Sequence, residues 1–160
     1  MCGIAAYLGS EQAYPLLTAA LSKLEYRGYD SAGIALIDGN GDIHLNKTIN
    51  KVASLSENNS KASIKSTVGI AHTRWATHGS PTVPNAHPHV DKDNNIAVVH
   101  NGIIENFAEL KAQLQKQGYE FVSETDSEVI PHLIAQQMKE GLDFESAFAS
   151  LNKLLQGSQA

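Results

Sequence analysis

The sequence predicts an α+β fold with antiparallel sheets, and three features of the chain indicate it. Strand-length apolar runs alternate along the 160 residues with longer segments of helical periodicity. The turn at residues 38–42, Asp-Gly-Asn-Gly-Asp, joins two strand patterns and favours a hairpin, which pairs its strands antiparallel. A hydrophobic fraction of 42% with 18% charged residues is typical of a globular chain. We expect one domain over residues 1–160.

The N-terminal half begins with a predicted buried strand at residues 2–8, which are small and apolar and include β-branched Ile4. A helix is expected at 10–24, where leucine and alanine recur at helical spacing, and Gly28 ends this segment. Residues 32–37 and 43–45 form the two strands of the hairpin. The polar stretch 51–65 is expected to be a surface helix or loop without a chemical role.

The C-terminal half is predicted to contain two further strands and three helices. The strands, at 68–73 and 96–100, are separated by a loop at 76–95 whose length is typical of functional loops. Residues 105–117 show an amphipathic helical pattern that Gly118 ends. Asp126 and Asp143 are of the residue type that caps helix N-termini, so helices are expected at 127–138 and 144–155.

Composition argues against several classes of protein. The formal net charge is −5 and the basic residues are scattered singly, so no nucleic-acid partner is expected. The longest apolar runs, such as 68–71 and 96–99, are far shorter than the roughly 20 residues that span a bilayer, so no membrane segment is expected. The N-terminus does not resemble an export signal. With one cysteine no internal disulfide can form, which favours a cytoplasmic location.

That cysteine occupies position 2, and its position suggests a nucleophile. Removal of Met1 would leave a thiol and a free α-amine on the same residue. The reference pKa is about 7.7 to 8.0 for the amine and about 8.5 for the thiol, so near neutral pH the amine can accept the thiol proton without a histidine partner. The alternative is that Cys2 is only a small buried strand residue.

Five segments in order carry a family resemblance: Cys2-Gly3-Ile4, Tyr26-Arg27-Gly28-Tyr29-Asp30-Ser31-Ala32-Gly33, His72-Thr73-Arg74-Trp75-Ala76-Thr77-His78-Gly79, His100-Asn101-Gly102-Ile103-Ile104-Glu105-Asn106 and Ser123-Glu124-Thr125-Asp126-Ser127-Glu128. Together they resemble the glutaminase domains of glucosamine-6-phosphate synthases, which are class II glutamine amidotransferases with an N-terminal nucleophile. The likeness runs from residue 2 to about 155. It implies the αββα four-layer sandwich of N-terminal nucleophile hydrolases.

The resemblance also implies that part of the family's architecture lies beyond this sequence. The family's glutaminase domain continues for several strands past the point that matches Leu155, and its isomerase domain is absent here. We therefore expect a C-terminally incomplete sandwich, with residues 157–160 starting the next strand. An exposed sheet edge and apolar surface would favour self-association into a homo-oligomer.

Residue roles follow from the same resemblance. Asn101, through its side-chain amide, and Gly102, through its backbone N–H, would form an oxyanion hole, which needs donors about 2.7 to 3.1 Å from the developing charge. The alternative for this pair is an ordinary Asn-Gly hairpin turn. Arg74 would clamp the carboxylate of free L-glutamine and Asp126 would pair with its ammonium. The alternatives are a surface ion pair for Arg74 and a helix N-cap for Asp126.

The remaining implied roles concern the closure of the site. Trp75, Thr77 and His78 would lie on a loop that covers glutamine, and Trp75 would control where ammonia goes. Arg27 would order the N-terminus, with simple packing as the alternative. The spacings of the five histidines from 72 to 100 do not match zinc sites, so neither a metal nor another cofactor is expected.

The predicted reaction is hydrolysis of L-glutamine to glutamate and ammonia through a Cys2 thioester. In the full synthase the ammonia would pass to fructose 6-phosphate on the isomerase domain, which gives glucosamine 6-phosphate. Two alternatives remain: a non-catalytic remnant that binds glutamine for regulation, and a related enzyme that donates ammonia to another acceptor. Loss of Met1, measured by mass spectrometry, and glutamate release distinguish an active enzyme from the remnant.

Overall fold

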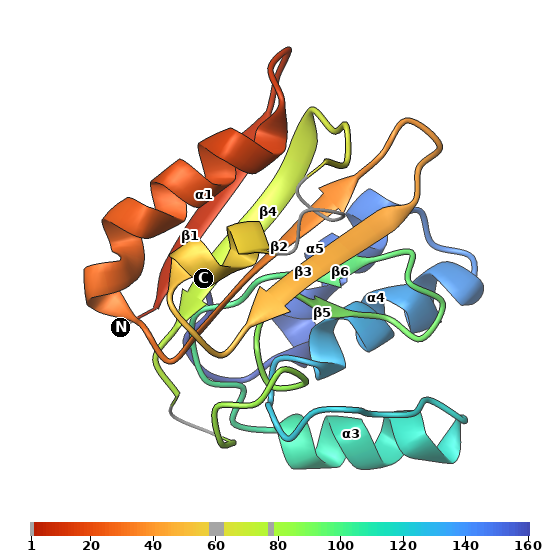
Figure 1. Ribbon diagram of the computed structural model, residues 1–160. Helices are drawn as coiled ribbons and strands as arrows, with labels where there is room; N and C mark the ends of the chain where they lie inside the picture. Colours follow the sequence, from red (N-terminus) through yellow and green to blue (C-terminus); the bar gives the residue numbers. More distant parts are fainter. Residues whose placement is uncertain (1, 58–62, 77–78) are drawn as a thin grey trace.

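In the computed structural model, which describes residues 2–57, 63–76 and 79–160, a four-stranded antiparallel sheet forms around the predicted hairpin. The strand order is β1 (Gly3–Leu8), β4 (Val68–Arg74), β2 (Ser31–Ile37) and β3 (Ile43–Thr48). The β2–β3 hairpin is confirmed, with Ile37 paired to Ile43 beside the turn. Helix α1 (Ala13–Leu24) packs along β1 and β4 (Figure 1).

A second, two-stranded sheet consists of β5 (His89–Val90) and β6 (Ala97–Val98), which are antiparallel. Helices α4 (Val129–Lys139) and α5 (Phe144–Leu154) pack against each other, and α4 contacts both of these strands. Helix α3 (Phe107–Lys116) packs against α4. Figure 1 shows α1 on one outer side and α4 and α5 on the other, with the two sheets between them.

Two hydrophobic clusters fill the spaces between these layers. One lies between α1 and the four-stranded sheet and includes Leu17, Leu21 and Ile34. The other lies among α3, α4, α5 and β6 and includes Leu114, Val129 and Ile134. Each helix therefore buries one apolar face against its own partner, as amphipathic helices require.

The prediction that residues 51–65 form a surface helix or loop is partly wrong. The stretch contains the short 3-10 helix η2 (Val52–Glu57), which contributes two side chains to the core. Val52 and Leu55 are buried there, 2% and 1% exposed. Another short 3-10 helix, η1 (Glu25–Arg27), follows α1. Residues 58–62 lie outside the described part of the chain. An isolated Val and Leu in a polar segment carry too little periodicity to reveal this burial.

The C-terminal predictions are confirmed in part. Asp143 caps α5, since its side chain accepts a hydrogen bond from the backbone N–H of Ser146 at 2.7 Å. Asp126 does not cap α4, which begins at Val129 with no side-chain cap. The predicted loop 76–95 contains β5, and the strand expected at 96–100 is only two residues long.

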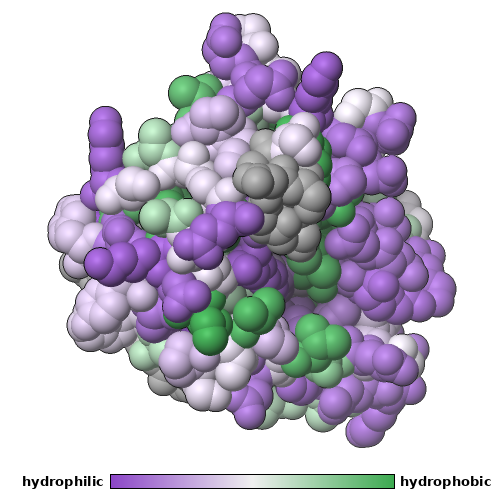
Figure 2. All heavy atoms as spheres, in the orientation of Figure 1, coloured by the Kyte–Doolittle hydropathy of each residue, from purple (hydrophilic) through white to green (hydrophobic). Residues whose placement is uncertain are grey.

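Most of the surface in view is hydrophilic. Figure 2 shows purple residues over most of that face, and outside the grey atoms the hydrophobic residues form small separate groups. No helix among the described residues is both long and apolar enough to cross a membrane. Self-association stays a prediction.

Candidate active site

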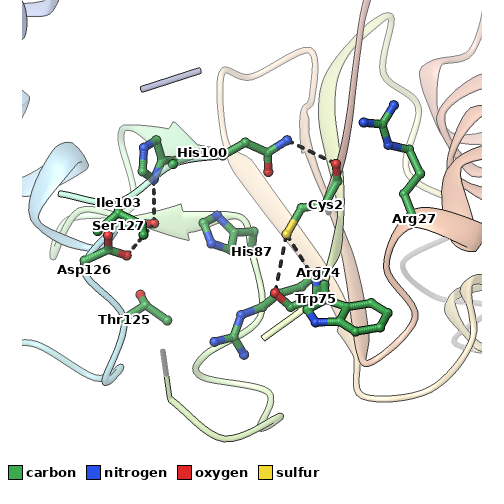
Figure 3. A pocket seen from close by; sticks show the side chains of 12 residues that line it. Cys2, Arg27, Arg74, Trp75, His87, His100, Ile103, Thr125, Asp126 and Ser127 are labelled. Carbon is green, nitrogen blue, oxygen red and sulfur yellow. Dashed lines mark hydrogen bonds between the residues drawn. The ribbon is translucent and has the colours of Figure 1, made fainter. Parts of the chain in front are cut away.

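A cavity of about 310 Å³ lies where the start of β1 meets the end of β4 and the loops around residues 100 and 126. Figure 3 shows Cys2 on one side of it, with Asp126 and Ser127 on the other. Its lining includes seven described residues to which the sequence assigns a role: Cys2, Arg27, Arg74, Trp75, Asn101, Gly102 and Asp126. The structure therefore brings these separate segments into one site.

The pairing of β1 with β4 positions the Cys2 thiol. Gly3 pairs with Thr73, and its N–H donates to the Thr73 hydroxyl at 3.2 Å. This pairing places Cys2 beside the end of β4. The Trp75 N–H then lies 3.2 Å from the Cys2 sulfur and donates to it. A fixed amide donor stabilises negative charge on that sulfur. The cysteine is half-buried, so it is not the fully buried strand residue of the alternative interpretation.

Asn101 and Gly102 belong to a paired segment and not to a hairpin turn. Asn101 exchanges two backbone hydrogen bonds with Ala160, each 2.8 Å long, and Gly102 forms an antiparallel bridge with Gln159. Gly102 has a φ of 150°, and a Cβ atom there would lie 2.1 Å from the carbonyl oxygen of Ser158. The glycine therefore permits a close approach between two chains, and the hairpin alternative is wrong.

The Asn101 side chain reaches the nucleophile. Its Nδ2 donates to the carbonyl oxygen of Cys2 at 3.3 Å, and its Oδ1 lies 2.9 Å from Nε2 of His72. The amide is thus held between His72 on β4 and the backbone of Cys2. A donor in this place faces the same cavity as the sulfur, as an oxyanion hole requires.

Arg74 supplies a buried positive charge. It ends β4 and is only 4% exposed, so a surface ion pair does not describe it. Its guanidinium donates to the carbonyl oxygens of Gly79 at 3.1 Å and Ser80 at 3.4 Å. These bonds fix the orientation of a group that can bind a carboxylate in bidentate fashion.

Asp126 supplies the opposite charge. Its Oδ2 accepts a bond of 2.7 Å from the backbone N–H of Ile104, and its Oδ1 accepts one of 3.2 Å from the Ser127 hydroxyl. The carboxylate is 7% exposed and lines the cavity with Arg74. A fixed cation at Arg74 and a fixed anion at Asp126, both lining the same cavity, suit a zwitterionic amino acid.

Trp75 and Arg27 lie at the edge of the site. The Trp75 ring is 48% exposed and packs edge-to-face on Tyr29, with ring centroids 5.5 Å apart. Arg27 is half-buried and lines the cavity, as Figure 3 shows. The other two residues predicted on the covering loop, Thr77 and His78, lie outside the described residues.

Sequence reasoning assigned no role to several lining residues: His87, His100, Ile103, Thr125 and Ser127. Four of these five lie within the segments that carry the resemblance, so their proximity to Asn101 and Asp126 was a usable signal. His87 had no such signal, because it belongs to the long loop before β5.

Three histidines form a buried cluster beside the cavity. The rings of His72 and His87 stack with centroids 4.2 Å apart, and His87 meets His89 edge-on at 4.4 Å. Burial lowers the pKa of His72 to about 4 and that of His89 to about 3, and it lowers the pKa of His87 well below its ordinary value. All three are therefore neutral at pH 7. Within the described ranges no group of three or more His, Cys, Asp or Glu side chains is arranged to hold a metal.

Comparison with known proteins agrees with this geometry. Residues 37–149 match the family model of the glutamine amidotransferase domain. The chain is 53% identical to the isomerizing glutamine–fructose-6-phosphate aminotransferase of Chlamydia abortus, over 99% of this chain and 26% of that protein. It is 50% identical to the enzyme of the same name from Methanothermobacter thermautotrophicus, over 100% of this chain and 27% of that protein. The chain thus spans about a quarter of the length of these relatives.

Solved structures share the fold. The glutamine phosphoribosylpyrophosphate amidotransferase of B. subtilis superposes with a TM-score of 0.82 at 26% identity, over 100% of this chain and 34% of that one. A structure described as the allosteric regulatory enzyme of purine biosynthesis gives a TM-score of 0.85 at 28% identity over the same shares. The predicted α+β fold of the N-terminal nucleophile hydrolases is confirmed. The chain belongs to the glutamine amidotransferase domain family.

Proposed function

We propose that this chain hydrolyses L-glutamine to glutamate and ammonia, with Cys2 as the nucleophile after Met1 is removed. The observation that carries the proposal is the cavity itself. The side chains of Cys2, Asn101, Arg74 and Asp126 line the same 310 Å³ space and bring to it a thiol, an amide donor, a cation and an anion. Glutamine presents a carboxamide, a carboxylate and an ammonium, and each has a matching group.

The reaction begins when the Cys2 amine accepts the thiol proton and the sulfur attacks the carboxamide carbon. The carbonyl oxygen becomes an oxyanion, which Nδ2 of Asn101 and the N–H of Gly102 stabilise. The C–N bond then breaks, the amine proton passes to the departing nitrogen, and ammonia and a γ-glutamyl thioester result. Water, deprotonated by the same amine, attacks the thioester and releases glutamate, and the proton returns to the sulfur.

The charged groups select the substrate. Arg74 binds the α-carboxylate and Asp126 binds the α-ammonium, so that the side-chain amide extends toward the sulfur. Trp75 and Arg27 lie at the edge of the cavity and help to enclose the bound amino acid. Roles for Thr77 and His78 in covering glutamine stay predictions from the sequence.

The acceptor of the ammonia is proposed from the relatives. Proteins 50–53% identical to this chain are named glutamine–fructose-6-phosphate aminotransferase, whereas the amidotransferases of purine synthesis are 26–28% identical. We therefore propose fructose 6-phosphate as the acceptor, bound by an isomerase domain, and glucosamine 6-phosphate as the product. A cytoplasmic location accords with this metabolism.

Glutamate release by the purified chain tests the proposal against a non-catalytic glutamine-binding module. Protein whose intact mass shows loss of Met1 should release glutamate steadily, and Cys2→Ala should abolish the release while glutamine still binds. Cys2→Ser is the matched control, because it keeps the size and polarity of the side chain with a weaker nucleophile, and it should retain at most a small residual rate. Undiminished release from Cys2→Ala would refute the assignment.

A further inference from the structure

The ring of His72 lies directly behind the Asn101 amide. Its Nε2 is 2.9 Å from Oδ1 of Asn101, and the ring is 1% exposed. On its other side, Nδ2 of Asn101 donates to the carbonyl oxygen of Cys2 at 3.3 Å. The amide therefore has two anchors, one for each of its polar atoms.

The hydrogen-bond pattern fixes which nitrogen of His72 carries its proton. Burial lowers the pKa of this ring to about 4, so it is neutral near pH 7 and has a single N–H. If the amide of Asn101 were rotated by half a turn, its Oδ1 would face the carbonyl oxygen of Cys2, and two acceptors would oppose each other. The observed arrangement avoids this only when His72 donates from Nε2.

The ring itself has little freedom to move. His72 lies on the inner strand β4, paired with Ile4 on one side and Gly33 on the other. Its face stacks on His87 at a centroid distance of 4.2 Å and an interplanar angle of 22°. The carbonyl oxygen of His87 in turn packs against Gly33 so closely that a Cβ atom on this residue would lie only 2.1 Å from the oxygen. The pairing of β4, the close packing at Gly33 and the stacked ring of His87 thus hold the His72 ring in place.

We propose that His72 is a positioning residue for the oxyanion hole: its Nε2–H holds the Asn101 amide so that Nδ2, and not Oδ1, faces the reacting carbonyl. The proposal rests on the glutaminase function proposed above. Without this donor the amide can rotate and present an oxygen to the developing oxyanion. Loss of one oxyanion donor lowers kcat by about 100- to 1000-fold. When the donor is present but free to rotate, kcat should fall less, by about 10- to 100-fold.

Two substitutions of similar polarity separate positioning from packing. His72→Gln can place its amide nitrogen close to the position of Nε2, whereas the shorter His72→Asn cannot reach it. We expect His72→Asn to lower kcat by about 10- to 100-fold with little change in KM for glutamine. His72→Gln should restore most of the kcat. A purely structural role would lower the activity and thermal stability of both variants together, and would overturn the proposal.

A second measurement reports on the oxyanion hole through a molecule that places an oxygen in it. Glutamate γ-semialdehyde adds to a cysteine thiol, so that an S–C bond forms and the thiol hydrogen passes to the former carbonyl oxygen, which then occupies the oxyanion site. Its affinity should fall in His72→Asn by the same factor as kcat, while the affinity for glutamate stays unchanged. Equal aldehyde affinities in His72→Asn and the parent chain would overturn the proposal.

A third measurement is independent of activity and separates this inference from the proposed function. Nitrogen-15 NMR of the trimmed chain at pH 7 should show His72 protonated at Nε2 and unprotonated at Nδ1. A parent chain that releases no glutamate would refute the glutaminase function, and the NMR result would still decide the hydrogen bond to Asn101. The opposite tautomer would overturn the inference even in a fully active enzyme.

Discussion

Asp126 is expected to bind substrate through its charge and to hold the backbone through one oxygen, and two substitutions separate these roles. Asp126→Asn removes the charge but keeps a carbonyl oxygen that can accept from the Ile104 N–H, now bonded at 2.7 Å. Asp126→Ala removes both. Ile104 is 0% exposed, so in the alanine variant its buried N–H loses the acceptor that it has in the protein.

The magnitudes follow from these contacts. A hydrogen bond to a charged group contributes about 1.5–3 kcal/mol, so loss of the charge should lower kcat/KM for glutamine by about 10- to 150-fold, mainly through KM. Asp126→Asn should otherwise fold normally. Asp126→Ala should lose a similar factor in kcat/KM and also about 1–3 kcal/mol in the free energy of unfolding, because it leaves a buried donor unsatisfied.

Steady-state glutamate release and urea denaturation measure the two effects separately. Asp143→Asn is the control for the change in net charge, since Asn also caps helices and Asp143 lies at the start of α5. It should leave both measurements unchanged. A parental KM in Asp126→Asn would refute the ammonium role, and equal destabilisation of Asp126→Asn and Asp126→Ala would refute the backbone role.

Three further predictions concern stability. Gly33→Ala should lower the free energy of unfolding by about 1–3 kcal/mol in urea, because its Cβ would lie 2.1 Å from the carbonyl oxygen of His87; parental stability would contradict this close packing. Asp143→Ala should cost about 0.5–2 kcal/mol through loss of the cap on α5, and Asp143→Asn should cost far less; equal losses would argue against the cap. Burial raises the pKa of Glu128, but the His132 ring, with Nε2 3.8 Å from the carboxylate, and hydrogen bonds from Ser123 and the backbone N–H of Val122 outweigh it and lower the value to about 2. Its folded-state pKa lies below the unfolded one, so its contribution is present above about pH 4.5 and is lost as the pH falls toward 2. Glu128→Gln should therefore flatten the fall in stability over that range, and an unchanged pH profile would contradict the assignment.

Elements set by local signals were predictable from the sequence. The Asp-Gly-Asn-Gly-Asp turn identified the β2–β3 hairpin, and the pattern before Phe144 identified the cap at Asp143. The same residue type failed at Asp126, because the N–H of Ile104, 22 residues away, engages its carboxylate. Strand β5 was missed for a similar reason: two residues in a loop have no periodicity of their own, and only the contact with β6 makes them a strand.

The candidate site shows the same division. The segments of the family resemblance identified four site residues, and the structure brings all of them to one cavity: Cys2, Arg74, Asn101 and Asp126. Their mutual support was not visible, because it depends on strand register and packing between layers. The contact of His72 with Asn101 is an example, since it joins residues 29 apart that belong to different parts of the fold.

Covalent labelling of the trimmed, folded chain by a glutamine analogue with an electrophilic side chain tests the central claim most directly. Peptide mass spectrometry should find the label on the sulfur of Cys2, and excess glutamine should slow its attachment. Asp126→Asn should be labelled more slowly at the same analogue concentration. Absence of the label from Cys2, or labelling that glutamine does not slow, would contradict the account.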